Sequence, residues 1–169
     1  AGGVHASTPA TILVIFSQLN ALSRKGEIRP FDQDADGTLL GEGVGMLTLK
    51  RLEDAERHGD RIYALIKGIG TASDGRALGL LAPRLEGEEL ALRRAYEAAG
   101  VDPASVELIE AHGTATAVGD AVEVEALNRV FGAKPDGPPR CALGSVKSMI
   151  SHTMPASGSA GMIKAALAL

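Results

Sequence analysis

The chain has 169 residues, of which 45% are hydrophobic and 22% are charged, so it is globular and large enough to bury one core. A net charge of -4 and a sequence pI near 5.6 argue against a nucleic-acid-binding or anionic-membrane surface, and an aromatic content of 3% argues against platforms for stacked bases. The single cysteine excludes an internal disulfide. The longest strongly apolar run, residues 12–16, is too short to span a membrane, and no signal-peptide pattern is present, so we expect a cytoplasmic protein.

Helices, loops and strands alternate along the first part of the chain. Ser7 or Thr8 can cap a helix that has Pro9 at its first position, and Gly59 can end a second helix. The expected elements are, in order, a helix over 9–23, a loop over 24–42, a strand over 43–52, a helix over 52–59 and a strand over 62–72.

The second part continues this alternation, which predicts a layered α/β fold. Gly100 stands just past the end of a helix whose apolar face carries Leu92, Ala95, Tyr96 and Ala99. The expected elements are a connection over 73–84, a helix over 87–99, a strand over 106–111, a helix over 120–131, a link over 132–139, a strand over 141–146, a loop over 147–157 and a last helix from 158. The last helix is apolar on nearly every side, so we expect this chain to be a fragment of a larger domain that covers it.

Glu123 lies on the apolar face of the helix predicted over 120–131. Its companions at helical spacing are Ala126, Leu127 and Val130. A carboxylate in that position needs a partner, unless it lies at the edge of the face and reaches water. Glu125 instead points toward Arg129 one turn later, so these two side chains are expected to form an exposed ion pair.

Two local patterns resemble ligand loops. The segment DQDADG, residues 32–37, resembles the start of a calcium loop, but Gly43 stands where the bidentate glutamate is needed, so calcium is a minor alternative. The glycines of GEGVG, residues 41–45, precede a strand instead of joining a strand to a helix. They therefore indicate close backbone packing and not a dinucleotide site.

Three other residues with reactive side chains receive a structural interpretation. Cys141 begins an apolar strand and has no base near it in the sequence, which favours a packing role over nucleophilic catalysis. His5 lies near the first residue, and His58 lies at a helix end. Both are expected to be surface or packing residues.

His112 and His152 are the leading candidates for a functional site. Each lies in a loop rich in Gly, Ser and Thr directly after an apolar strand, the usual place for site residues in an α/β domain. Neighbouring strands would bring both imidazoles into one pocket with Lys147. Zinc would need a third ligand and is opposed by the lysine, so neutral imidazoles that donate N–H to a developing oxyanion fit better. Two loop histidines that only satisfy backbone groups remain an alternative.

The segments EAHGTATAVGDAVEVEAL and GSVKSMISHTMPASGSAGMIKAALAL resemble the two histidine motifs of the β-ketoacyl synthases, the decarboxylating branch of the thiolase-like condensing enzymes. AGGVH and residues 21–68 are also similar to this family, most of all to ketosynthase domains of multifunctional type I polyketide and polyunsaturated fatty-acid synthases. The resemblance implies an incomplete thiolase-like α-β-α-β-α fold. Residues 1–60 would end its N-terminal half, and residues 61–169 would form most of its C-terminal half.

The resemblance implies an acyltransferase that performs a decarboxylative Claisen condensation. An acyl chain passes from the phosphopantetheine arm of an acyl carrier protein to a cysteine, and malonyl-carrier protein then loses CO₂ to give the attacking enolate. On the matching positions, His112 and His152 would stabilise that enolate, and Lys147 would hold the second histidine and a nearby carboxylate in place. No cofactor or metal would be bound directly.

Four more residues match the family pattern. Glu123 would supply the carboxylate, with Asp120 capping its helix, and the hydroxyls of Thr114 and Thr116 would hydrogen-bond the pantetheine arm.

Three positions depart from that pattern. Many members have glycine at Ala115 and Ser151 and asparagine at Met149. The methyl of Ala115 is expected beside the pantetheine path, and the other two changes affect the loop that aims His152.

The family's nucleophilic cysteine is expected upstream of Ala1, so the chain alone should neither condense substrates nor fold stably. A non-nucleophile at that place would favour a second function, a non-condensing ketosynthase-like partner such as a chain-length factor or scaffold that binds carrier protein. The presence of both histidines and the lysine favours the enzyme. The family also implies a homodimer.

Overall fold

The computed structural model describes residues 1–75, 82–132 and 141–169. Its strands and helices, including two short 3-10 helices, are, in chain order, β1 (Gly2–His5), α1 (Ala10–Gln18), β2 (Gly43–Met46), α2 (Leu52–His58), α3 (Leu85–Ala99), η1 (Pro103–Ser105), β3 (Leu108–Glu110), α4 (Ala117–Phe131), β4 (Ala142–Gly144), α5 (Lys147–Ile150), η2 (Met154–Ala156) and α6 (Ser157–Ala168).

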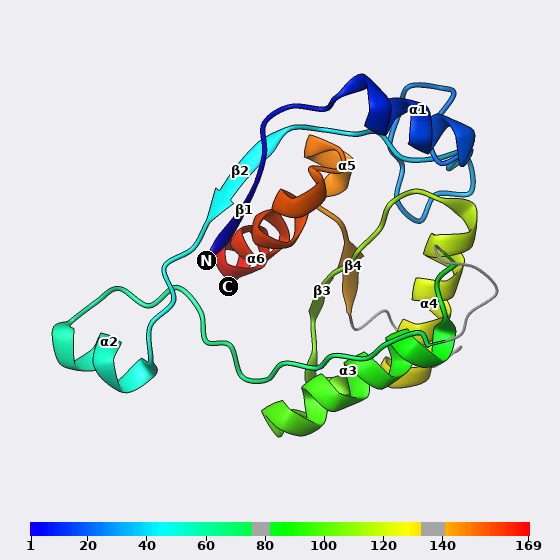
Figure 1. The fold of residues 1–169 in the computed structure, drawn as a ribbon. Coiled ribbons are helices and arrows are strands. Elements are labelled where there is room, and N and C mark those ends of the chain that lie inside the picture. Colours follow the sequence, from blue (N-terminus) through cyan, green and yellow to red (C-terminus); the bar gives the residue numbers. More distant parts are fainter. Residues whose placement is uncertain (76–81, 133–140) are drawn as a thin grey trace.

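The elements form alternating layers of strands and helices (Figure 1). β1 and β2 pair antiparallel, whereas β3 and β4 pair parallel. Helix α6 lies between the two pairs and contacts β1, β2 and β3. Helices α3 and α4 pack against each other beyond the parallel pair. This order confirms the predicted layered α/β architecture.

Two predicted helices are confirmed together with the glycines that end them. Gly59 follows α2 with φ 67°, and Gly100 follows α3 with φ 63°. Glycine adopts this left-handed conformation without a Cβ penalty, so both helices stop where the sequence predicts. On α4, the predicted ion pair between Glu125 and Arg129 also forms, with the carboxylate oxygen 3.0 Å from Nε.

The first helix differs from its prediction. It ends at Gln18 instead of residue 23, and Asn20 after it has φ 51°. Pro9, not Ser7 or Thr8, occupies the N-cap position, and no side chain caps the helix. The Thr8 hydroxyl instead lies 3.0 Å from His5 Nε2, so it is not available to the helix end.

The prediction of a strand over 62–72 is wrong, since this stretch forms no strand. A strand needs a neighbour for its backbone hydrogen bonds, and no strand in the described part of the chain pairs with it. For the same reason β2 stops at Met46, which pairs with Gly2 at the start of β1, a strand that was not predicted. Residues 76–81 of the predicted connection over 73–84 and residues 133–139 of the predicted link over 132–139 lie outside the described residues.

The glycines of residues 41–45 do pack closely against other backbone, as predicted. A Cβ on Gly45 would lie only 2.4 Å from Ser159 Oγ on α6. Helix α6 can therefore lie close to β2 only because this position carries no side chain.

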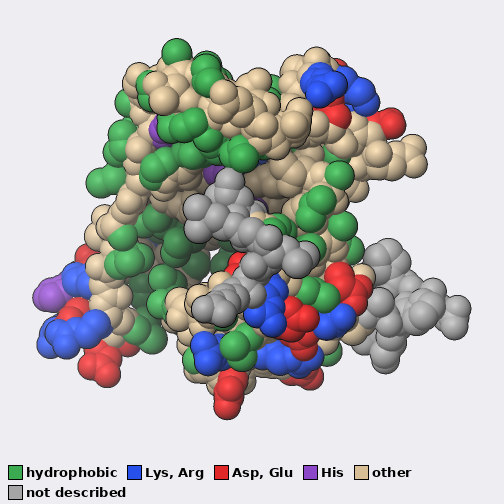
Figure 2. Space-filling model, turned by 45° about the vertical axis from the view of Figure 1, so that its right-hand side comes forward, with side chains coloured by type: hydrophobic (Ala, Val, Ile, Leu, Met, Phe, Trp, Pro, Cys, Tyr) green, Lys and Arg blue, Asp and Glu red, His purple; other side chains and the backbone are tan. Residues whose placement is uncertain are grey.

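Large apolar side chains remain exposed on several elements, and Figure 2 shows hydrophobic side chains over much of the face that it presents. They include Val14 on α1, Val44 on β2, Leu167 on α6 and Ile69 in the stretch after α2. Among the helices that the structure describes, none is long and apolar enough to cross a membrane.

Candidate functional site

The two histidines lie together at the carboxyl ends of the parallel strands. Glu110 pairs with Gly144, so β3 and β4 end side by side. His112 follows β3 by two residues, and His152 follows the short helix α5 that begins just after β4. The two imidazole rings meet edge to face, with centroids 5.8 Å apart and planes at 89°. The predicted shared location of the two imidazoles is therefore confirmed.

Two carboxylates of helix α4 hold the loop that carries His112. Glu123 accepts the backbone N–H groups of His112 and Gly113 at 2.6 and 2.8 Å. Asp120 accepts the N–H of Ala115 at 3.0 Å and that of Phe31 at 2.7 Å. These bonds shape the turn in which the imidazole stands, because they fix the backbone on both sides of it.

The prediction that Asp120 caps this helix is wrong. Helix α4 begins at Ala117, and Thr116 occupies the N-cap position without a side-chain cap. Asp120 lies inside the first turn, where a carboxylate is favoured by the helix dipole, and its oxygens face the loop before the helix. The helix starts three residues earlier than predicted because small residues of the turn join it.

Lys147 is buried, with 4% of its surface exposed, and its Nζ donates to the carbonyl oxygen of His112 at 2.5 Å. In the described part of the chain, neither Glu123 nor His152 accepts a hydrogen bond from it, which corrects the expected partners. Burial lowers the pKa of Lys147, against the opposite effect of the nearby carboxylates of Glu123, Glu110 and Asp120. Lys147 therefore ties the start of α5 to the His112 loop.

The backbone of His152 is held by a segment far away in the sequence. Its N–H donates to Leu39 O at 2.8 Å, and its carbonyl accepts from Gly41 N at 3.0 Å. A Cβ on Gly41 would lie 2.4 Å from Ile150 O, so glycine is needed for this approach. The glycine pattern of residues 41–45 predicted close packing, but nothing in the sequence identified the His152 loop as the partner.

The ring of His152 has a defined tautomer. Its Nδ1 accepts the backbone N–H of Met154 at 3.1 Å and lies 2.9 Å from Ser157 Oγ. Because a backbone N–H can only donate, Nδ1 carries no proton, and the ring hydrogen is on Nε2. Burial, then the positive charge of Lys147 and the neighbouring His112 and His5, lower the pKa of His152 to about 4.

The pKa of His112 is also lowered, first by burial and then by Lys147, with Glu123 and Asp120 opposing the shift. Both imidazoles are therefore neutral near pH 7. A pair of neutral imidazoles can donate N–H to an oxygen that becomes negative, and it can do so without losing a proton.

Thr114 and Thr116 follow His112 by two and four residues, and their hydroxyl oxygens are 3.2 Å apart. Ala115 between them has φ 62° and is fully buried, so its methyl group packs inside the protein and does not line an open path, which corrects that expectation. In the second loop, Ser151 has φ 63° and ψ -175°, a conformation that is essentially restricted to glycine. Met149 is 81% exposed.

The remaining candidates lie apart from the pair or have other contacts. Asp36 already accepts Ser23 Oγ at 2.6 Å and the N–H groups of Arg24 and Lys25, which lower its pKa. Cys141 is half-buried, and burial raises the pKa of its thiol, which opposes a nucleophilic thiolate. In the ranges 1–75, 82–132 and 141–169, no group of three His, Cys, Asp or Glu side chains is placed to hold a metal ion.

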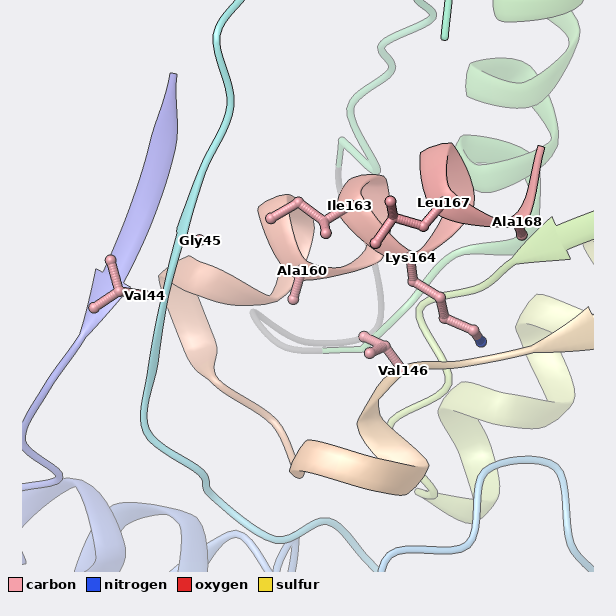
Figure 3. A pocket seen from close by; sticks show the side chains of 8 residues that line it. All are labelled: Val44, Gly45, Val146, Ala160, Ile163, Lys164, Leu167 and Ala168. Atoms are coloured by element: carbon pink, nitrogen blue, oxygen red, sulfur yellow. The ribbon is translucent and has the colours of Figure 1, made fainter. Parts of the chain in front are cut away.

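An apolar groove of about 470 Å³ lies between β2 and α6 (Figure 3). Its lining includes Val44, Val146, Ile163 and Leu167 but none of the predicted site residues. Lys164 is the charged member of the lining, and Figure 3 shows its side chain leaving α6 toward β3 and β4.

Comparisons with known proteins agree with this geometry. The family model described as "Beta-ketoacyl synthase, N-terminal domain" matches residues 1–55, and the one described as "Beta-ketoacyl synthase, C-terminal domain" matches residues 63–169. The division predicted at residue 60 stays a prediction.

Similar proteins include a phenolphthiocerol/phthiocerol polyketide synthase of Mycobacterium bovis, 45% identical over 100% of this chain and 9% of that protein. A polyunsaturated fatty acid synthase of Thraustochytrium sp. is 47% identical over 91% of this chain and 6% of its own length. Among solved structures, the ketosynthase from module 6 of the bacillaene synthase from Bacillus subtilis 168 matches with a TM-score of 0.92 and 42% identity, over 98% of this chain and 30% of that one. The chain thus spans only a small part of these relatives. It belongs to the β-ketoacyl synthase family, has the thiolase-like fold of the ketosynthases and is similar to polyketide and polyunsaturated fatty-acid synthases.

Proposed function

We propose that this chain supplies the malonyl-decarboxylating part of a condensing enzyme that extends acyl chains carried by an acyl carrier protein. The observation that carries the proposal is the pair of neutral imidazoles, His112 and His152, whose centroids are 5.8 Å apart beside the buried Lys147. This short distance supports a site in which one thioester oxygen receives an N–H from each ring.

The chemistry follows from these donors. When the carboxylate of the malonyl thioester leaves as CO₂, the electron pair of the broken C–C bond moves toward the thioester carbonyl and forms an enolate. The Nε2–H of His152 and an imidazole N–H of His112 hydrogen-bond the oxygen that gains this negative charge. The enolate carbon then attacks an acyl thioester on a cysteine, and the cysteine leaves as a thiolate. Lys147 keeps the His112 loop in place through its carbonyl.

The substrates would reach the site on the phosphopantetheine arm of the carrier protein, so the chain itself would bind no separate cofactor. The hydroxyls of Thr114 and Thr116, exposed enough to meet a ligand and 3.2 Å apart, suit the amide groups of such an arm. A cytoplasmic location and a homodimer of the complete domain belong to the same proposal.

The alternative is a non-condensing partner that keeps the fold and the carrier-binding surface. A pure scaffold has no chemical need for two neutral imidazoles, a fixed Nε2–H tautomer and a buried lysine beside them. The two functions differ in the residue upstream of Ala1 at the nucleophile's place. The coding sequence there should specify a cysteine for the enzyme, whereas a glutamine would support the partner.

The direct test measures CO₂ release from malonyl-carrier protein and acylation of the upstream nucleophile separately, in the full-length protein that carries this chain. His152→Ala should reduce decarboxylation roughly 100-fold to 1,000-fold, the usual effect of losing an oxyanion donor, and should spare acylation. His58→Ala, at the exposed end of α2, is the control and should change neither. Unchanged CO₂ release in His152→Ala would refute the assigned role.

A further inference from the structure

A carboxylate that was not among the predicted site residues connects the segments that carry His112, Lys147 and His152. Glu110 is the last residue of β3, and its side chain is 12% exposed. Its Oε1 accepts the backbone N–H of Val146 at 2.6 Å, and its Oε2 accepts Lys164 Nζ at 2.7 Å. Both oxygens are therefore engaged by groups from other elements.

Each of these contacts reaches a different part of the site. Glu110 precedes His112 by two residues, Val146 directly precedes Lys147, and Lys164 lies on α6, the helix that follows the His152 loop. One carboxylate thus joins the strand end before the first histidine, the turn before the lysine, and the helix after the second histidine.

The protein makes room for this side chain. Gly161 on α6 is buried, and a Cβ there would lie 3.1 Å from Glu110 Cγ, tighter than ordinary contact. The ammonium of Lys164 balances the charge of the carboxylate, so Glu110 can be buried next to Lys147 without an uncompensated negative charge.

We infer that Glu110 and Lys164 form a positioning pair that aligns His112, Lys147 and His152 for malonyl decarboxylation. Neither residue touches the imidazoles. The pair acts through the backbone of Val146 and through α6, and the inference rests on the proposed function for its kinetic consequence. A displacement of about 1 Å at a reacting centre can cost roughly 100-fold in rate, so a loss of alignment is measurable even when the fold is kept.

Three variants of the full-length protein separate alignment from stability. Glu110→Ala removes both contacts and should lower kcat for malonyl decarboxylation at least roughly tenfold, with KM within about twofold, because only the transition state senses the alignment. Glu110→Gln keeps an acceptor for Val146 but turns an amide donor toward the ammonium, so its loss should be smaller. In the double variant Glu110→Gln with Lys164→Gln, the two amides can hydrogen-bond each other, and kcat should recover to within about threefold of the wild type.

Glu89→Gln is the matched control, since this carboxylate also accepts from two cations, Arg93 and Arg129, but lies between the outer helices. It should leave kcat unchanged. Alignment also has a readout that needs no activity, the pKa of His152 followed by NMR. In Glu110→Ala this pKa should rise toward its ordinary range, as the ring leaves its partly buried place beside Lys147.

Failure of the proposed function and failure of this inference have different signatures. Absence of CO₂ release in the wild type would refute the proposed function. The pKa of His152 would then still show whether Glu110 and Lys164 align the site. Folded Glu110 variants with wild-type kcat and an unchanged His152 titration would overturn the inference, as would a double variant no better than Glu110→Gln.

Discussion

Replacing Ser151 by glycine should stabilise the protein, although a serine side chain is lost. Ser151 has φ 63° and ψ -175°, a region that costs a residue with a Cβ about 1–3 kcal/mol. Its hydroxyl makes no hydrogen bond in the described part of the chain. Glycine costs about 0.5–1 kcal/mol through the larger entropy of the unfolded chain. Subtracting the entropy cost from the relieved strain predicts that Ser151→Gly stabilises the protein by about 1 kcal/mol. The substitution also removes strain directly before His152.

The measurement is denaturant unfolding of the complete domain that contains this chain. Ser151→Gly should raise the midpoint without changing the slope, since the surface exposed on unfolding stays the same. Ser7→Gly is the matched control, because Ser7 is exposed and does not have a positive φ. In Ser7→Gly only the larger entropy of the unfolded chain acts, and it should lower the free energy of unfolding by about 0.5–1 kcal/mol. Two variants that shift the midpoint equally and downward would show that Ser151 does not adopt this conformation in solution.

Three further predictions concern the same loops. Ala115→Gly also relieves a positive φ, worth about 1–2 kcal/mol, but it loses a fully buried methyl group and adds chain entropy, so unfolding should show a change within about 1 kcal/mol of zero; a clear stabilisation would contradict this sum. Glu123→Leu leaves the N–H groups of His112 and Gly113 without an acceptor and should cost about 2–4 kcal/mol of unfolding free energy, whereas Glu123→Gln, which keeps one acceptor oxygen, should cost less; equal losses would argue against the backbone role. His152 has a pKa of about 4 in the folded protein, below its unfolded value of 6.5, so the unfolded state binds more protons between these pH values. The free energy of unfolding should therefore fall as pH is lowered from 6.5 to 4. His152→Gln should flatten this pH dependence, and an unchanged slope would refute the low pKa.

The sequence predicted the approach of His112 and His152 because a general rule applies to them. Both follow apolar strands, and parallel strands that pair place their carboxyl ends together. The stops of α2 and α3 at Gly59 and Gly100 were predictable for a similar reason, since the local conformation there requires glycine. In both cases the information lies within a few residues.

Contacts between distant segments were not predictable in this way. The helical face of Glu123 indicated that its carboxylate either has a partner or reaches water at the edge of the face. It did not indicate that the partners would be backbone N–H groups and not Lys147. Residues 62–72 have strand propensity, yet propensity cannot supply the partner strand. The backbone hydrogen bonds of His152 with Leu39 and Gly41 produce no periodic pattern in either segment, so the sequence could not predict them.

The hydrogen bonds of His152 with Leu39 and Gly41 affect when the site is assembled during folding. The His112 loop closes on Glu123, only eleven residues further along, so it can form soon after these residues leave the ribosome. The His152 loop needs Leu39 and Gly41, which are synthesised much earlier and must wait with their hydrogen-bonding groups open to water. Such non-local pairing is slow, since the entropy of closing a long loop is lost before any contact is gained. We therefore expect the second histidine to be the last part of the site to find its place during folding.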